Sequence, residues 1–137
     1  MSDDYSPFAL VVDDDVFIRM DAASILEDAG FRTYQAGTAA EAIEILHHAG
    51  ESIQLLFSDV VMPGGRDGFW LARECSSRWP HIGILLSSGH VRPKPGDLPA
   101  GAEFVDKPFS AEIVQHRVSQ ILPDGAKPEP LKAAVAR

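Results

Sequence analysis

Polar side chains follow directly after apolar runs at four places in this 137-residue chain. They are Asp13, Asp14 and Asp15; Ser58 and Asp59; Ser87 and Ser88; and Asp106 and Lys107. If carboxylates, a hydroxyl and an ammonium group converge, they can carry out phosphoryl transfer. One carboxylate is then the nucleophile, while a divalent cation and the lysine offset the charge of the phosphoryl oxygens. Such chemistry needs a fold that brings the four places to one edge.

The apolar runs before these residues have the length of β-strands. Residues 8–12, 53–57 and 82–86 are largely apolar without strict alternation, which is typical of parallel strands covered on both faces. Residues 31–36 and 103–105 are weaker candidates for outer strands. Because parallel strands end at the same edge of a sheet, the polar residues after them are expected to meet there.

Apolar residues between these strands recur at helical spacing. Asp15, Thr38 and Ser110 can cap the starts of three of the helices, and Gly30 can end the first. Alternating strands and helices with short joints predict an α/β fold, a parallel sheet with helices on both faces. The helical stretches are residues 18–29, 42–49, 69–79 and 114–121.

One link between strands breaks this alternation. A helix is expected between residues 86 and 103, but Pro93, Pro95 and Pro99 interrupt helical hydrogen bonding there. The sequence therefore predicts a loop, or at most one short helical turn, in place of the fourth helix.

Several carboxylates within a few ångströms of one another repel when ionised, so the cluster must take up protons or bind a cation. An open, partly hydrated site made only of oxygen ligands suits Mg²⁺ better than zinc, and Mn²⁺ is a possible substitute. Lys107 at the rim can hold an anion beside the metal.

Four motifs lie at the predicted strand ends: ALVVDDD at 9–15, SDVVMP at 58–63, LLSSG at 85–89 and FVDKPF at 104–109. In this order they resemble the receiver domain of two-component response regulators, in its single-domain, chemotaxis-type form. The resemblance covers about residues 8–122 and implies a flavodoxin-like five-stranded parallel sheet in the order 2-1-3-4-5. The Pro-rich segment at 90–100 departs from the family's fourth helix.

By this resemblance, Asp59 is the phosphoacceptor. Asp14 is implied as a direct Mg²⁺ ligand, joined by Asp59 and the backbone carbonyl of Val61. Asp13 is implied to hold the ion through water.

The resemblance also implies a switch. Ser87 matches the Ser/Thr whose hydroxyl turns toward the phosphoryl group, and Lys107 matches the lysine that pairs with that group. Phe104 occupies the position of the switch aromatic. Pro108 implies a cis peptide bond after the lysine, since an X-Pro bond tolerates cis at low cost.

The expected organisation is an N-terminal extension at 1–7, a receiver domain at 8–122 and a flexible C-terminal tail at 123–137. The implied function is to accept a phosphoryl group from a sensor histidine kinase or histidine phosphotransferase. The signal then passes by onward phosphotransfer or by binding an unknown downstream protein. Such a protein is no enzyme beyond its own self-catalysed phosphorylation and dephosphorylation.

The composition limits the classes of binding partner and the cellular compartment to be expected. With 20 acidic residues against 12 Lys and Arg, the formal net charge of -8 disfavours nucleic-acid binding, which needs a basic face. Cys75 is the single cysteine, so no internal disulfide can form. We expect a cytoplasmic protein without a membrane partner, because neither a signal peptide nor a membrane-length apolar run is found.

Three alternatives remain at this point. The chain could be the C-terminal receiver part of a hybrid histidine kinase. It could be a haloacid-dehalogenase-like phosphatase, although Phe17 stands where that family's Asp-x-Asp-x-Thr/Val motif needs Thr or Val. It could also be a pseudo-receiver that has lost phosphorylation, although the motif residues are retained.

Overall fold

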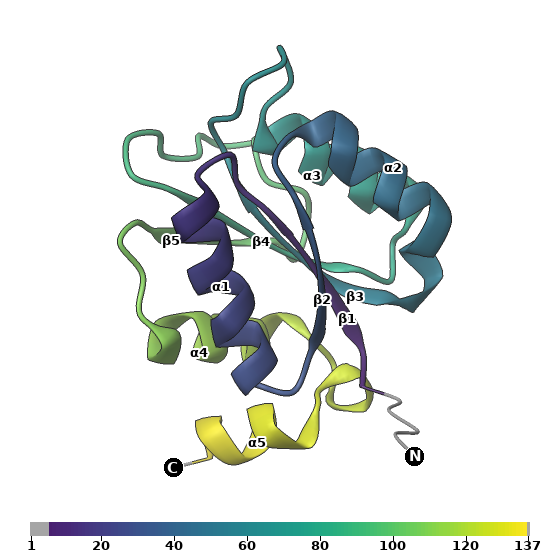
Figure 1. Ribbon diagram of the computed structural model, residues 1–137, viewed down its shortest axis with the longest axis vertical. Helices are drawn as coiled ribbons and strands as arrows, with labels where there is room; N and C mark the ends of the chain where they lie inside the picture. The colour runs from purple at the N-terminus through teal and green to yellow at the C-terminus, as the bar shows by residue number, and fades with distance from the viewer. Residues whose placement is uncertain (1–5, 137) are drawn as a thin grey trace.

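The computed structural model describes residues 6–136, and its centre is a five-stranded sheet (Figure 1). All neighbouring strands are parallel, and their order is β2-β1-β3-β4-β5. The predicted sheet and its order are therefore confirmed. The strands are β1 (Phe8–Val12), β2 (Arg32–Ala36), β3 (Ile53–Asp59), β4 (Gly83–Ser88) and β5 (Glu103–Asp106).

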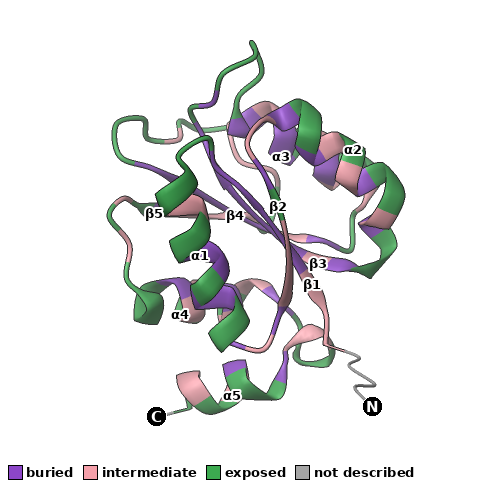
Figure 2. Cartoon of the chain, in the orientation of Figure 1, coloured by how far each residue is buried: buried purple, intermediate pink, exposed green. Residues whose placement is uncertain are grey.

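Helices cover both faces of the sheet, with α2 and α3 on one side and α1 and α4 on the other (Figure 1). Strand residues alternate between the two apolar cores: Leu56 and Leu86 face α2 and α3, whereas Phe57 and Leu85 face α1 and α4. This two-sided burial explains the continuous apolar runs (Figure 2). The helices are α1 (Val16–Asp28), α2 (Ala39–Ala49), α3 (Gly68–Arg78), α4 (Ala111–Ile121) and α5 (Glu129–Val135).

The predicted caps bound the helices. The carboxylate of Asp15 accepts hydrogen bonds from the amides of Phe17 and Ile18, which starts α1 directly after β1. Ser110 caps α4 through the amide of Ile113. None of the helices described within residues 6–136 is long and apolar enough to cross a membrane.

The link between β4 and β5 contains no helix, as the prolines predict. Residues 89–102 form bends and turns instead, and Leu98 packs against the core on the α2 and α3 side. An ion pair of 2.9 Å between Arg92 and Asp106 ties this loop to the end of β5.

The C-terminal segment differs from the expected flexible tail at 123–137. Residues 129–135 form α5, which packs along α4, and Leu131 is fully buried in the core on the α1 and α4 side. A side chain at position 30 would lie 2.6 Å from Pro128, so the absence of one in Gly30 lets the segment approach. Ala126 and Val135 also pack against this core, so the segment meets a surface that is already apolar. Residues 1–5 of the expected N-terminal extension lie outside the described range.

Candidate functional site

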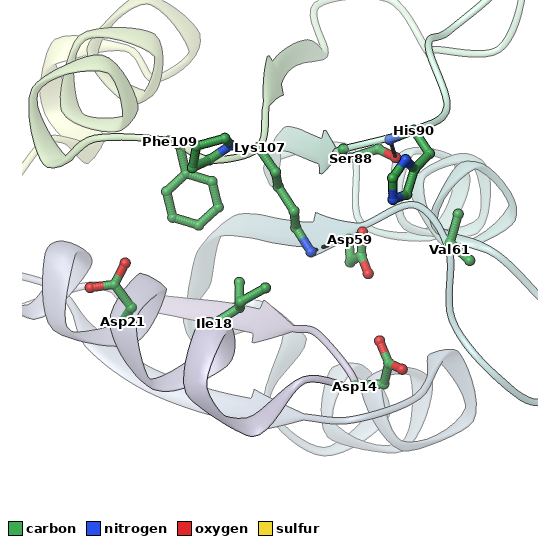
Figure 3. Close-up of a pocket in the computed structure, with 11 residues that line it drawn as sticks. Asp14, Ile18, Asp21, Asp59, Val61, Ser88, His90, Lys107 and Phe109 are labelled. Carbon is green, nitrogen blue, oxygen red and sulfur yellow. Dashed lines mark hydrogen bonds and ion pairs between the residues drawn. The ribbon is translucent and has the colours of Figure 1, made fainter.

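A cavity of about 590 Å³ opens at the carboxyl edge of the sheet. Figure 3 shows Asp59, Lys107 and Ser88, from three different strand ends, beside one another in it. The register explains the meeting: Val12 pairs with Ser58 and Asp59 with Ser87, so β1, β3 and β4 end level. The edge predicted from the sequence is therefore where the polar side chains converge.

Three carboxylates form the acidic part of the site. One oxygen from each of Asp13, Asp14 and Asp59 lies within 4.8 Å of the others. Asp13 and Asp59 are only 3% and 7% exposed, while Asp14 is exposed at the mouth. Such a cluster of oxygen ligands, open on one side, can hold a divalent cation that prefers oxygen and keeps some of its water. Val61 also lines the cavity, with its side chain exposed.

Lys107 joins two of the carboxylates. Its Nζ lies 2.8 Å from an oxygen of Asp13 and 3.3 Å from one of Asp59. Its backbone amide donates to the carbonyl of Ser88, which fixes the start of the following segment against β4. The peptide bond between Lys107 and Pro108 is cis. The ammonium group is thus placed where it can pair with a negatively charged group attached to Asp59.

Burial and pairing act in opposite directions on these groups. Burial raises the pKa of Asp59, and this outweighs the charge of nearby Lys107, which lowers it. Burial alone would lower the pKa of Lys107, but its hydrogen bond to Asp13 and the charges of Asp59 and Asp13 raise it overall. The lysine is therefore held charged, while Asp59 is ionised at some cost to the folded state.

The raised pKa of Asp59 predicts a dependence of stability on pH. An acid with a raised folded-state pKa stabilises the fold at low pH, and that contribution is lost as pH rises through the folded-state value. We expect metal-free Asp59→Asn to melt at a higher temperature than wild type at neutral pH, with the difference shrinking toward the ordinary aspartate value of 3.8. Thermal unfolding in EDTA across this range measures it. A variant less stable at neutral pH would contradict this account.

The serine that lines the cavity is Ser88, whereas Ser87, the serine chosen from the sequence, does not line it. β4 continues through Ser88, and its side chains alternate between the two faces. Ser87 therefore shares the face of Leu85, whereas Ser88 shares that of Leu86 and of Phe104 on β5. Ser87 is 2% exposed and is absent from the residues lining the cavity. The alternation within 82–88 was the signal that could have selected Ser88.

Phe104 is half-buried and packs against the core on the α2 and α3 side. Its strand partner is Leu86, two residues before Ser88. The sequence did not indicate that the cavity extends beyond the strand ends, between α1 and the segment after β5, where Ile18, Asp21 and Phe109 line it. All five histidines are exposed, and His90 lines the cavity (Figure 3).

Comparison with known proteins gives the same family as the sequence motifs. The family model of the response regulator receiver domain matches residues 9–119. The sensor kinase CckA of Brucella abortus (strain 2308) is 33% identical over 120 residues, which cover 85% of this chain and 13% of that protein. The transcriptional regulatory protein FixJ of Azorhizobium caulinodans is 31% identical over 109 residues, which cover 72% of this chain and 47% of that protein. This chain thus spans less than half the length of these two relatives.

Solved structures agree with the sequence matches. The receiver domain from the hybrid histidine kinase CckA has a TM-score of 0.73 at 29% identity and covers 85% of this chain and 99% of that one. The response regulator receiver protein from Sinorhizobium medicae WSM419 has a TM-score of 0.73 at 27% identity, and the match covers 94% of this chain and 97% of that one. From its sheet, its acidic edge and these matches, this chain belongs to the response regulator receiver domain family.

Proposed function

We propose that this chain accepts a phosphoryl group on Asp59 in a Mg²⁺-dependent reaction, from the phosphohistidine of a sensor histidine kinase or a histidine phosphotransferase. The observation that carries the proposal is the position of Lys107, whose Nζ bridges Asp13 and Asp59 at the acidic mouth. A surface lysine would turn to water. Here its side chain is only 17% exposed and lies against two carboxylates, where it can pair with an incoming anion.

In the reaction, an oxygen of Asp59 attacks phosphorus, the P–N bond of the donor breaks, and the imidazole leaves with the bonding electron pair. Asp14, Asp59 and the backbone carbonyl of Val61 are the proposed cation ligands, with Asp13 acting through water. The oxygen-only donor set fits Mg²⁺ or Mn²⁺. When bound, the ion offsets the charge of the carboxylates and phosphoryl oxygens. Lys107 then pairs with a phosphoryl oxygen.

Ser88 is the proposed switch hydroxyl, in place of Ser87. Its Oγ accepts hydrogen bonds from the amides of His90 (3.3 Å) and Val91 (3.0 Å), and it lies in the cavity with Asp59. Turning toward a phosphoryl oxygen would allow the hydroxyl to donate a hydrogen bond to it. Phe104, on the same face of the sheet, is the proposed aromatic that responds.

Paired alanine variants separate the two serines. Ser88→Ala is expected to slow phosphorylation of Asp59 by about tenfold or more, since a hydrogen bond to a charged group contributes roughly 1.5–3 kcal/mol. Ser87→Ala removes an equivalent hydroxyl group on the opposite face of the sheet, and it is expected to leave the phosphorylation rate near that of wild type. The rates are measured from the phosphorylated fraction over time by intact mass. The reverse order would restore Ser87 as the switch residue.

The proposed output is phosphorylation-dependent binding of a downstream protein, or onward phosphotransfer, with residues 8–122 as the functional unit. Catalysis would be limited to the chain's own phosphorylation and dephosphorylation. The family match favours neither alternative, the C-terminal part of a hybrid kinase or the haloacid-dehalogenase-like phosphatase. Retention of Asp13, Asp14, Asp59 and Lys107 argues against a pseudo-receiver.

Incubation with acetyl phosphate and Mg²⁺ tests the proposed function. We expect intact mass to show one added phosphoryl group, to show none in excess EDTA, and to revert after hydroxylamine, which cleaves acyl phosphates. Absence of labelling with Mg²⁺ present would favour a pseudo-receiver. Repeated turnover of a generic phosphatase substrate would favour the phosphatase instead.

A further inference from the structure

Arg19 is the only Lys or Arg among the first 30 residues, and it lies beside the carboxylate cluster. From α1, its Nη1 donates a 2.9 Å hydrogen bond to the backbone carbonyl of Asp13. Its Nε donates a 3.3 Å hydrogen bond to the side-chain oxygen of Gln35 on β2. Within the described part of the chain it forms no ion pair. The guanidinium group therefore holds the backbone carbonyl of Asp13, and its own position is fixed by Gln35 on the neighbouring strand.

The bond to Arg19 completes the fixation of Asp13. The Asp13 amide donates to the carbonyl of Ala36 at 3.1 Å. One carboxylate oxygen accepts from the amide of Asp15 at 2.9 Å, and the other accepts from Lys107 at 2.8 Å. Arg19 holds the remaining polar group, the carbonyl oxygen. Every polar group of this nearly buried residue thus has a partner.

That carbonyl belongs to the peptide unit joining Asp13 to Asp14. Because a peptide unit is planar, the direction of its carbonyl fixes the direction of its N–H and the position of the next Cα. Asp14 is exposed, yet one of its carboxylate oxygens lies within 4.8 Å of those of Asp13 and Asp59. The orientation of this peptide unit therefore sets the backbone position from which Asp14 reaches the other two carboxylates.

We propose that Arg19 is a positioning residue for the cation site: by holding the peptide unit between Asp13 and Asp14, it directs the carboxylate of Asp14 toward those of Asp13 and Asp59. This inference rests on the proposed Mg²⁺ site. The charge of Arg19 works against the same site, because a fixed cation near the carboxylates repels a bound one. Positioning and charge therefore predict opposite effects when Arg19 is replaced.

Calorimetric titration of metal-free protein with Mg²⁺ tests the inference. Arg19→Gln is expected to weaken Mg²⁺ binding by about tenfold or more, within the range typical of residues that orient metal ligands, although it removes a repelling charge. Arg19→Lys keeps the charge but lacks the planar fork that reaches both partners, so it is expected to bind Mg²⁺ weakly too. Arg73→Gln, at an exposed position on α3, is the control for the charge change and should bind like wild type.

Two further measurements separate positioning from general stability and from the proposed function. The melting temperature in EDTA should stay close between Arg19→Lys and wild type while their Mg²⁺ affinities differ. Gln35→Ala removes only the anchor of Arg19 and should also weaken Mg²⁺ binding, so it decides the question if Arg19→Gln does not fold. Unchanged or tighter Mg²⁺ binding in these variants would overturn the inference. Wild type that fails to bind Mg²⁺ would overturn the proposed function instead.

Discussion

Replacing Asp59 by Asn is expected to abolish phosphorylation by acetyl phosphate. The side chain of Asn has nearly the same shape, so it fits the same buried position, but its neutral amide lacks the nucleophilic carboxylate oxygen. The loss should be complete, because the neighbouring Asp13 is already engaged by the amide of Asp15 and by Lys107. Intact mass after incubation with Mg²⁺ and acetyl phosphate measures the added phosphoryl group.

Asp106→Asn is the matched control for this variant. Asp106 also ends a strand at the carboxyl edge, but it is exposed and pairs with Arg92 at 2.9 Å on the loop side. We expect it to be phosphorylated like wild type, since an exposed ion pair contributes little. Equal labelling of Asp59→Asn and wild type would mean that another residue is the acceptor, and the site assignment would then fail.

The sequence predicted the sheet and its acidic edge because both follow from local patterns. Runs such as residues 8–12 had to be buried on both faces, and only parallel strands under two layers of helices do that. Once the strands are parallel, the residues at their carboxyl ends lie at one edge of the sheet, and these include Asp13, Asp59 and Lys107. Capping residues such as Asp15 then fixed where the helices begin.

Tertiary detail accounts for what the sequence did not predict. The choice between Ser87 and Ser88 depended on which face each side chain takes, and the expected end of the strand at residue 86 left that undecided. The last helix depended on Gly30, nearly 100 residues earlier, which leaves room for Pro128. Composition could not show that a segment with few apolar residues, Leu131 and Val135 among them, would pack against an apolar surface.

Asp14→Asn is expected to weaken Mg²⁺ binding by about 100-fold or more. The change removes a direct ligand's charge, whereas losing a partner that only orients a ligand typically costs 10–100-fold. Asp14 is the exposed member of the carboxylate cluster, so its replacement should leave the fold intact. Phosphorylation at low Mg²⁺ concentration should fall with the affinity and recover in part when Mg²⁺ is raised. Calorimetric titration gives the affinity, and labelling at graded Mg²⁺ gives the recovery.

Asp15→Asn tests whether this effect is specific to the ligand. It removes the same charge one residue away, and because Asn caps helices about as well as Asp, α1 should still start at Val16. A loss of bulk negative charge would weaken Mg²⁺ binding in both variants alike. A lost ligand would weaken it far more in Asp14→Asn, and equal affinities in the two variants would show that Asp14 does not contact the ion.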